Sequence, residues 1–563
     1  MAAARPGLWL DAAERRRGAA LAELVWCNPF LPRRVELERE ALGDRSVGAG
    51  AVWHKGSPDS GSHKEAGAPV ESPNWPRLAE ATQELVAALH GRLAARARFG
   101  AEDAALYRDL VYSLLYERYA EDLFLLLPRE HAPAPAGHFP HWDEMQAELA
   151  RLLDPVGDLL PGPGHGIDAA HLLACFFQVR RAFHYLHHFL LGGSPGAARL
   201  RAETWHSIFG HDMRRYQRSL WEAMADIPTL VTGPSGSGKE LVARAIALSR
   251  YAPFSPSERS FAIDLDSCFI PLNLGALPLT LIESELFGHK RGSFTGAVED
   301  RTGWLEQCTP AGTVFLDEIA ELEPALQVKL LRVVEARTFH RLGESRPRRF
   351  AGKLVAATHR ELGVEMRAGR FREDLYYRLC GDIVRTPSLA ERLRDSPEEL
   401  ALLVAHLAHT IVGPEEGPVV AAETVRWIER SLPADYPWPG NVRELGQCVR
   451  NVLLRREYHP DWQVAAGGRA GPAAELAAEV EAGGLTLQQL ARRYTTLVYA
   501  RSGSYLEAAR RLGLDRRTVR AYVDEDLLAE LRGGVRRPLP EDEEPPGAPT
   551  SAPPGAPTGP ESI

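Results

Sequence analysis

The residues with the clearest capacity for chemistry form a glycine-rich run that ends in a lysine. The run comprises Gly233, Pro234, Ser235, Gly236, Ser237, Gly238 and Lys239, with the apolar segment TLVT before it and ELVARAIAL after it. Glycines let backbone N–H groups turn inward around phosphate oxygens, a helix N-terminus adds positive potential, and the lysine reaches the terminal phosphates. This GxxxxGK pattern between a strand and a helix predicts a nucleotide-phosphate site, called the phosphate loop below. Glu240 stands where a magnesium-ligating Ser or Thr is usual, so the metal must rely on phosphate oxygens, water and a second motif.

The second motif is a pair of acids at the end of an apolar segment. In GTVFLDEIAEL, the strand-like residues from Thr313 to Leu316 lead directly into Asp317 and Glu318. Two carboxylates at the end of a buried strand are costly unless they serve a cation and a reacting water. We therefore expect Asp317 to orient hydrated magnesium and Glu318 to act as the general base for an attacking water.

These motifs need a sheet to position them. From Ile208 to about Arg455, short apolar strands alternate with helices, which is typical of a parallel α/β sheet. The phosphate loop follows one predicted strand and the acidic pair ends another. Between them lies GSFTGA, which comprises Gly292, Ser293, Phe294, Thr295, Gly296 and Ala297. Glycines near both ends and an aromatic tip indicate a tightly bent loop that presents Phe294 to something outside the nucleotide site.

Five segments carry a resemblance to a known family. In chain order they are the phosphate loop ending in Lys239-Glu240, ESELFGHKRGSFTGA, GTVFLDEI, GRFREDLYYRL and WPGNVREL. Together they closely resemble the bacterial enhancer-binding proteins, the NtrC-type AAA+ activators of sigma-54 RNA polymerase. The resemblance covers about 208–455 and implies an α/β P-loop ATPase domain with a helical lid, ATP and Mg²⁺ as cofactors, and a ring-shaped homo-oligomer, usually a hexamer. It names the sigma-54 RNA polymerase holoenzyme as partner, and Glu240 is the usual residue after the lysine in this family.

The resemblance also assigns roles to individual residues. Asn273 matches the residue that holds the catalytic glutamate inactive, and the GSFTGA loop matches the segment that contacts sigma-54. Arginine fingers that reach a neighbouring subunit's nucleotide are matched by Arg372 and Arg378. The remaining ATP-site matches are Thr358 and His359 for sensor I, Arg443 for sensor II, and Ile208, Phe209 and Gly210 for the adenine pocket.

Three features depart from the family pattern. Ser293 replaces the usual Ala of the loop, and we expect retained function, with weakened engagement as the alternative. His359 stands where Asn is more common, although its ring can still hydrogen-bond a water or a phosphate. The segment RYAPFSPSERSFAIDLDSCF, within 250–269, looks like an insertion on the rim of the ATPase domain and has no assigned role.

The segment from Thr486 to Val523 predicts a small DNA-binding domain. Its core is expected from Ala508, Ala509, Leu512, Leu514 and Val519, with a turn at Gly513 and an N-cap at Asp515. This helix-turn-helix pattern is similar to the Fis-type domain that closes many enhancer-binding proteins. Arg516, Arg517, Thr518 and Arg520 would enter a major groove of double-stranded DNA. The alternative is a solvated basic helix in a three-helix bundle.

The complete chain is predicted to be multidomain. Its 563 residues include 45% hydrophobic and 25% charged residues, ordinary values for globular proteins, and no apolar run long enough to cross a bilayer. We expect a cytoplasmic protein with no membrane partner. The expected divisions are a mainly helical regulatory region at 1–204 with a flexible stretch near 44–75, the AAA+ α/β subdomain at 205–385, its helical lid at 386–460, a linker at 461–485, the helix-turn-helix domain at 486–530 and a disordered tail at 531–563.

The function of the N-terminal region is not identified by any motif. Apolar helical segments include AHLLACFFQVRRAFHYLHHFLL, whose aromatic residues either form a core or line a small-molecule pocket between helices. For the whole chain, the leading expectation is a sigma-54-dependent activator that binds upstream DNA and uses ATP hydrolysis to remodel the closed polymerase complex. The alternatives are a DNA-binding regulator that uses the ATPase fold as a nucleotide switch, and an AAA+ enzyme that remodels another protein.

Overall fold

The structure is a computed structural model of the full chain. It describes residues 9–47, 73–94, 100–127, 137–160, 168–262, 268–276, 278–460 and 485–525, together with 476, 479–480, 483 and 527–528. The predicted disordered tail at 531–563 and most of the stretches at 44–75 and 461–485 lie outside these residues. The chain divides into two compact units, Met1–His459 and Pro460–Ile563.

A five-stranded parallel sheet forms the centre of the first unit. Its strands are β1 Thr229–Thr232, β4 Phe269–Asn273, β7 Thr313–Asp317, β10 Lys353–Thr358 and β11 Asp382–Arg385. They lie in the order β11-β1-β10-β7-β4, and every neighbouring pair is parallel. This sheet confirms the predicted parallel α/β core.

Helices cover both faces of this sheet. Along β7, Val314 and Leu316 pack with residues of three helices, α11 Leu279–Phe287, α13 Pro324–Ala336 and α15 Glu373–Leu379. Phe315 packs with residues of three others, α6 Ala169–Phe189, α7 Pro195–Phe209 and α10 Lys239–Leu248. Successive residues of a strand point to opposite faces, so this alternation means that both faces are buried. Burial of both faces of the sheet explains why β7 and β10 are continuous apolar runs in the sequence.

The elements around the sheet are short and numerous. They are α8 Met213–Arg215, η4 Tyr216–Leu220, α9 Trp221–Ala223, α10 Lys239–Leu248, β2 Phe254–Ser255, β3 Ser260–Phe261, α11 Leu279–Phe287, β5 Gly288–His289, β6 Arg301–Thr302, α12 Trp304–Gln307, η5 Ile319–Glu321, α13 Pro324–Ala336, β8 Thr338–Phe339, β9 Arg348–Arg349, α14 Leu362–Arg367 and α15 Glu373–Leu379.

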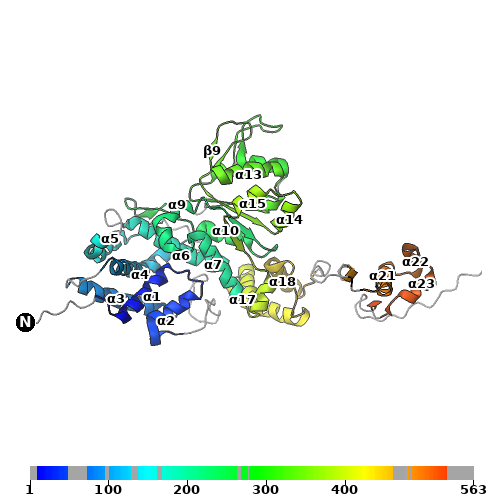
Figure 1. The fold of residues 1–563 in the computed structure, drawn as a ribbon, viewed down its shortest axis with the longest axis horizontal. Helices are drawn as coiled ribbons and strands as arrows, with labels where there is room; N and C mark the ends of the chain where they lie inside the picture. Colours follow the sequence, from blue (N-terminus) through cyan, green and yellow to red (C-terminus); the bar gives the residue numbers. More distant parts are fainter. Residues whose placement is uncertain are drawn as a thin grey trace, which may run out of the picture. The chain divides into compact units, whose positions relative to one another are not determined.

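The N-terminal region is helical, as predicted. It contains α1 Ala12–Trp26, α2 Arg33–Leu42, η1 Gly43–Arg45, α3 Trp75–Ala94, α4 Ala101–Leu125, α5 Trp142–Leu153, η2 Asp154–Leu159, α6 Ala169–Phe189 and α7 Pro195–Phe209. Figure 1 shows α6 and α7 running alongside α10, the helix that follows the phosphate loop. Residue 205, the predicted start of the ATPase domain, lies inside α7.

Side chains of α6 hold the C-terminal end of α10. Gln178 donates a hydrogen bond to the carbonyl of Ser249 at 3.0 Å. Arg181 donates to the carbonyl of Arg250 at 2.9 Å and also to that of Leu248. The last carbonyls of a helix have no partner within the helix, so these bonds satisfy groups that α10 cannot satisfy itself.

The insertion between α10 and β4 also packs on the N-terminal helices. Its described part forms the antiparallel pair β2 and β3. Phe261 stacks on Phe177 of α6 with ring centroids 4.1 Å apart, and Phe254 lies 4.9 Å from Trp142 of α5. The insertion is therefore part of the apolar core of the N-terminal region.

Three helices follow the sheet: α16 Leu389–Asp395, α17 Glu399–Ser431 and α18 Asn441–Arg455. Helix α17 has a kink at Gly413, whose φ of +84° lies outside the helical region. A buried ion pair between Arg392 and Glu399 joins α16 to α17. Glu399 also accepts a hydrogen bond from the backbone N–H of Ser194 at 3.0 Å, and Arg392 donates to the carbonyl of Leu191.

In the second unit, the structure describes the helices α21 Leu487–Ser502, α22 Tyr505–Leu512 and α23 Arg516–Tyr522. The predicted turn and cap are confirmed, because Gly513 has a φ of +65° and Asp515 accepts hydrogen bonds from the N–H groups of Arg517 and Thr518. Ala508, Ala509 and Val519 are buried as expected. The prediction for Leu514 is wrong: its side chain is 41% exposed, because it follows the left-handed turn and lies outside the apolar cluster.

Among the described residues, no helix is long and apolar enough to cross a membrane.

Candidate functional site

The phosphate loop lies between β1 and α10 and has the backbone that its glycines allow. Gly233, Gly236 and Gly238 all have positive φ values, of +146°, +75° and +97°. At Gly236 a β-carbon would lie 2.3 Å from the carbonyl oxygen of Gly440, so a side chain is excluded by the start of α18 as well as by conformation. The loop is therefore compact and is covered on one side by the start of α18.

Lys239 is the first residue of α10 and is buried. Its ammonium group donates hydrogen bonds to the carbonyls of Gly233 at 3.1 Å and Pro234 at 3.3 Å. Burial lowers its pKa, while the nearby carboxylates of Glu318 and Asp317 act in the opposite direction. The lysine is thus held inside its own loop, where a phosphate oxygen would replace carbonyl partners with a stronger, charged one.

The acidic pair lies at the carboxyl end of β7. Burial, followed by the neighbouring Glu318 charge, raises the pKa of Asp317, and the Lys239 ammonium partly offsets this. Asp317 accepts a hydrogen bond from the N–H of Glu318 at 3.1 Å. Glu318 itself has a left-handed backbone with φ of +56°, an uncommon conformation for a residue with a side chain. Such local strain is often found at functional sites.

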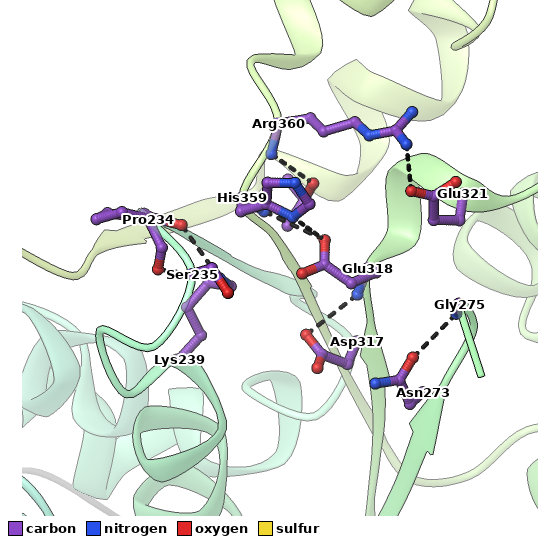
Figure 2. Close-up of polar contacts among 12 residues, drawn as sticks. Pro234, Ser235, Lys239, Asn273, Gly275, Asp317, Glu318, Glu321, His359 and Arg360 are labelled. Atoms are coloured by element: carbon purple, nitrogen blue, oxygen red, sulfur yellow. Dashed lines mark hydrogen bonds and ion pairs between the residues drawn. The ribbon is translucent and has the colours of Figure 1, made fainter. Parts of the chain in front are cut away.

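Glu318 is held by His359. The His359 ring Nδ1 donates to the Glu318 carboxylate at 2.7 Å, and the His359 backbone N–H donates to the same oxygen at 3.3 Å (Figure 2). His359 directly follows β10, whose register places it beside the acidic pair. Thr358, the predicted sensor I residue, is buried and accepts a hydrogen bond from the Arg360 N–H at 3.1 Å.

The side chain of Asn273 forms its hydrogen bond with a residue other than Glu318. It ends β4 opposite Asp317 in the sheet register. Its side-chain oxygen accepts from the N–H of Gly275 at 2.9 Å, and Figure 2 shows it turned toward that residue. Within the described part of the chain, the hydrogen bonds of the Glu318 carboxylate go to His359.

The start of α18 contacts the phosphate loop. Arg443 donates to the Ser235 hydroxyl at 3.2 Å, and Asn441 donates to the Ser235 carbonyl at 2.9 Å. Asn441 was not among the predicted site residues, although its place directly after the WPG turn was a signal. Ser237 adds a hydrogen bond with the Thr386 hydroxyl at 2.7 Å, which joins the loop to the chain after β11.

The other predicted nucleotide-binding residues have partners outside the phosphate loop. Glu240 forms an ion pair with Arg244 at 3.2 Å on the exposed side of α10. Ile208 and Phe209 are buried in the apolar core, and the Phe209 ring centroid lies 4.5 Å from that of Trp205, one turn earlier on α7. Gly210 ends α7 with a φ of +75°.

The two predicted arginine fingers lie on the surface near α15. Arg372 pairs with Asp374 at 2.7 Å, and Arg378 pairs with Glu335 at 2.8 Å. Their side chains are 44% and 60% exposed, so both pairs can exchange partners at small cost. Among the described residues, neither arginine contacts the phosphate loop of its own chain. Both exposed side chains can therefore reach a second molecule.

The GSFTGA loop is closed at its base and exposed at its tip. The Gly292 N–H donates to the Ala297 carbonyl at 2.9 Å, and positive φ values at Gly292 and Gly296 permit the tight turn. Phe294 is 37% exposed and its ring lies 5.0 Å from that of His289. The Ser293 hydroxyl is buried and has no hydrogen-bond partner among the described residues.

The predicted DNA-contacting residues lie in the first two turns of α23. Asp515 caps this helix, so Arg516, Arg517, Thr518 and Arg520 are fixed in helical geometry. Arg516, Arg517 and Arg520 are exposed. The Thr518 hydroxyl is directed to the Asp515 carboxylate at 2.5 Å.

Comparison with known proteins identifies the central part of the chain. Residues 211–384 match the family described as "Sigma-54 interaction domain". The chain is 42% identical over 229 residues to the Nif-specific regulatory protein of Azotobacter vinelandii, covering 40% of this chain and 40% of that protein. It is 37% identical over 305 residues to the transcriptional regulatory protein ZraR of Salmonella typhimurium (strain LT2), covering 54% of this chain and 64% of that protein.

A solved structure of NtrX from Brucella abortus in complex with ATP is also similar, with 24% identity, a TM-score of 0.35, and coverage of 65% of this chain and 76% of that one. The chain spans less than two thirds of the length of the curated relatives described above.

Proposed function

We propose that this chain, which carries a sigma-54 interaction domain at residues 211–384, is a sigma-54-dependent transcriptional activator that remodels the sigma-54 RNA polymerase holoenzyme by hydrolysing ATP. One observation carries the proposal. A single domain contains a complete phosphate loop, an acidic pair beside Lys239, and a loop with an exposed aromatic residue, Phe294.

The phosphate loop and acidic pair fit ATP with Mg²⁺. Among the described residues, the Lys239 ammonium group donates only to backbone carbonyls of its own loop, and Asp317 lies half-buried nearby with a raised pKa that a cation would lower. In the bound state Lys239 would bind terminal phosphate oxygens and Asp317 would hold the Mg²⁺ ion. The Mg²⁺ ion would neutralise part of the negative charge of the phosphates.

Glu318 is the general base in this proposal. Its carboxylate must accept a proton from water, and the bond to His359 occupies one of its oxygens. We assign the holding role to His359, because Asn273, which the family resemblance favours, is hydrogen-bonded to Gly275. Release of Glu318 from His359 then accompanies productive nucleotide binding.

Arg372 and Arg378 support action in a ring. A planar guanidinium can contact γ-phosphate oxygens through two donors as negative charge develops. Both side chains are exposed and carry only surface ion pairs. The proposal therefore includes a homo-oligomer, hexameric by family resemblance, in which these arginines complete the site of a neighbouring subunit.

The GSFTGA loop is the proposed sigma-54 contact. Its tip residues Phe294 and Thr295 are exposed, while its base is fixed by backbone hydrogen bonds and by the Lys290–Asp300 ion pair at 2.6 Å. A fixed base with an exposed aromatic tip can transmit displacement of the ATPase domain to a partner. Helix α23, in a helix-turn-helix arrangement, is the proposed reader of upstream double-stranded DNA through Arg516, Arg517, Thr518 and Arg520.

The experiment separates ATP hydrolysis from sigma-54 engagement. In Phe294→Ala, ATP hydrolysis should persist while promoter activation and the complex with sigma-54 trapped by an ATP transition-state mimic are lost. Val298→Ala is the matched control, because Val298 is an apolar residue just outside the loop and is 73% exposed. Glu318→Gln should abolish hydrolysis and retain ATP binding.

Two results would favour other functions. A wild-type chain that hydrolyses ATP but forms no trapped complex with sigma-54 would indicate a nucleotide-switched DNA-binding regulator. Remodelling that is unaffected by deletion of 486–523 would indicate an AAA+ enzyme acting on another protein. Phe294→Ala with normal promoter activation would remove the role assigned to the loop.

A further inference from the structure

The N-terminal helices enclose an apolar cavity of about 100 Å³. Aromatic side chains supply much of the wall, among them Trp26, Trp75, Tyr116, Phe176 and Trp205. A well-packed helical core contains few voids larger than a water molecule. A space of this size within one compact unit therefore requires an explanation other than core packing.

One carboxyl group in this wall lacks a full set of hydrogen bonds. Glu117, on α4, accepts a hydrogen bond from the Ser113 hydroxyl at 3.3 Å through Oε1. Its Oε2 is buried and has no hydrogen-bond partner among the described residues. Burial raises the pKa of Glu117 to about 8, so the group is mostly a neutral carboxylic acid at neutral pH. An unsatisfied buried polar atom is costly, and such atoms are rare in native proteins.

The charged side chains in the wall are engaged with neighbours. Arg34 forms an ion pair with Glu38 at 2.9 Å. The guanidinium of Arg180 lies over the Phe124 ring, 4.9 Å from its centroid. Burial also raises the pKa of the lining thiols of Cys27 and Cys175, which are therefore neutral. The wall thus favours an uncharged occupant. Besides Glu117, the indole N–H groups of Trp26 and Trp205 are buried in this wall without a hydrogen-bond partner among the described residues.

We propose that this cavity is a binding site for an uncharged aromatic small molecule whose hydroxyl or carbonyl group hydrogen-bonds Glu117. The aromatic walls would contact the rings of the ligand, and the carboxylic acid would fix its orientation. Binding sites for small molecules combine a mainly apolar lining with a few convergent polar groups. The apolar lining and the unsatisfied carboxyl oxygen of Glu117 meet that description.

The cavity is also connected to the phosphate loop. Tyr216 lines it and donates a hydrogen bond to Gln178 at 2.7 Å. Gln178 in turn holds the Ser249 carbonyl at the end of α10, the helix that begins with Lys239. On the other side, Trp205 and Phe209 line the cavity and end α7 just before Gly210. If the chain hydrolyses ATP as proposed above, an occupant of the cavity should change the rate of hydrolysis.

Binding is tested on the full chain with 1-naphthol and naphthalene, which differ by one hydroxyl group. Affinity is measured by calorimetry and by quenching of tryptophan fluorescence. Wild-type protein should bind 1-naphthol about tenfold more tightly than naphthalene, the difference that one hydrogen bond makes. Glu117→Leu should remove this preference and leave naphthalene binding in place. Glu121→Leu is the matched control, because Glu121 lies one turn further along α4 and is exposed.

A second variant tests the location independently of Glu117. Cys175→Phe places a ring in the cavity and should abolish binding of both probes, with circular dichroism confirming the fold. The inference is overturned if wild-type protein binds neither probe up to its solubility limit or shows no preference for 1-naphthol. Binding that Glu117→Leu and Cys175→Phe leave unchanged would also overturn it.

The connection to the phosphate loop has its own readout. The rate of ATP hydrolysis by wild-type protein should change on addition of 1-naphthol, and the rate of the Cys175→Phe protein should not. Binding without any change in hydrolysis would overturn the connection and retain the site. Absence of ATP hydrolysis under all conditions would count against the proposed function, and the binding measurements would still decide the cavity.

Discussion

Replacement of Arg392 by methionine should strongly destabilise the first compact unit. The Arg392 and Glu399 side chains are 8% and 0% exposed, and Arg392 Nε donates to the Glu399 carboxylate at 2.6 Å. Methionine preserves much of the side-chain length and removes the positive charge. Glu399 would then remain buried with the Ser194 N–H as its remaining partner among these contacts.

The magnitude follows from the cost of an uncompensated buried charge. Removing one partner of a buried pair typically costs about 3–5 kcal/mol, whereas replacing both partners with apolar residues is often neutral. Because the Ser194 N–H still stabilises the carboxylate, we expect the lower end, about 3 kcal/mol, for Arg392→Met. The double variant Arg392→Met with Glu399→Leu should cost less than about 1 kcal/mol.

The assay is urea denaturation of the full chain, followed by far-ultraviolet circular dichroism. Arg385→Met provides the matched control, because Arg385 pairs with Glu391 at 3.1 Å with side chains 73% and 41% exposed. An exposed pair of this kind should contribute less than about 1 kcal/mol. An Arg392→Met protein as stable as this control would refute the reasoning, as would a double variant less stable than the single one.

Three further outcomes are expected. Burial lowers the pKa of Lys353 from 10.5 to about 7, so between these values the unfolded chain binds more protons and this residue makes stability rise with pH. Lys353→Met should flatten that part of a plot of urea midpoint against pH, and an unchanged slope would contradict the assignment. Phe261→Ala should cost about 3–5 kcal/mol in unfolding free energy because Phe261 is buried against Phe177; a loss below about 1 kcal/mol would mean that the insertion does not pack there in solution. His359→Ala should raise basal ATP hydrolysis about fivefold, the equivalent of about 1 kcal/mol for a half-exposed hydrogen bond to a charged group, and a fall in rate would show that His359 positions Glu318 instead of holding it.

The elements that bear the nucleotide motifs were predictable because their physics is local. A glycine run needs positive φ values, and a buried parallel strand reads as a continuous apolar run, so β1, β7 and the phosphate loop follow from short segments. The start of α23 was predictable for the same reason, because Asp515 and Gly513 act within a few residues. Leu514 was misjudged because its burial depends on where the turn directs it.

The remaining features depend on contacts between distant segments. Nothing near Asn273 or His359 in the sequence indicates which of them holds Glu318, since the answer depends on the register of β4 and β10 on either side of β7. The role of the insertion was likewise hidden, because Phe254 and Phe261 pack on helices that precede them by many residues. The structure brings the predicted phosphate loop and acidic pair close together, and their hydrogen-bond partners come from segments that are distant in the sequence.

The bonds from α6 to the end of α10 determine how regulation of this protein can be studied. A shortened chain starting near residue 200 would lose Gln178 and Arg181, leaving the final carbonyls of α10 without those donors, and would expose Phe261 to water. A changed hydrolysis rate in such a fragment would reflect damage to the nucleotide-binding half and could not be read as release from repression. The N-terminal helices stabilise the nucleotide-binding domain that follows them. Their effect on ATP hydrolysis must therefore be measured with single substitutions in the intact chain.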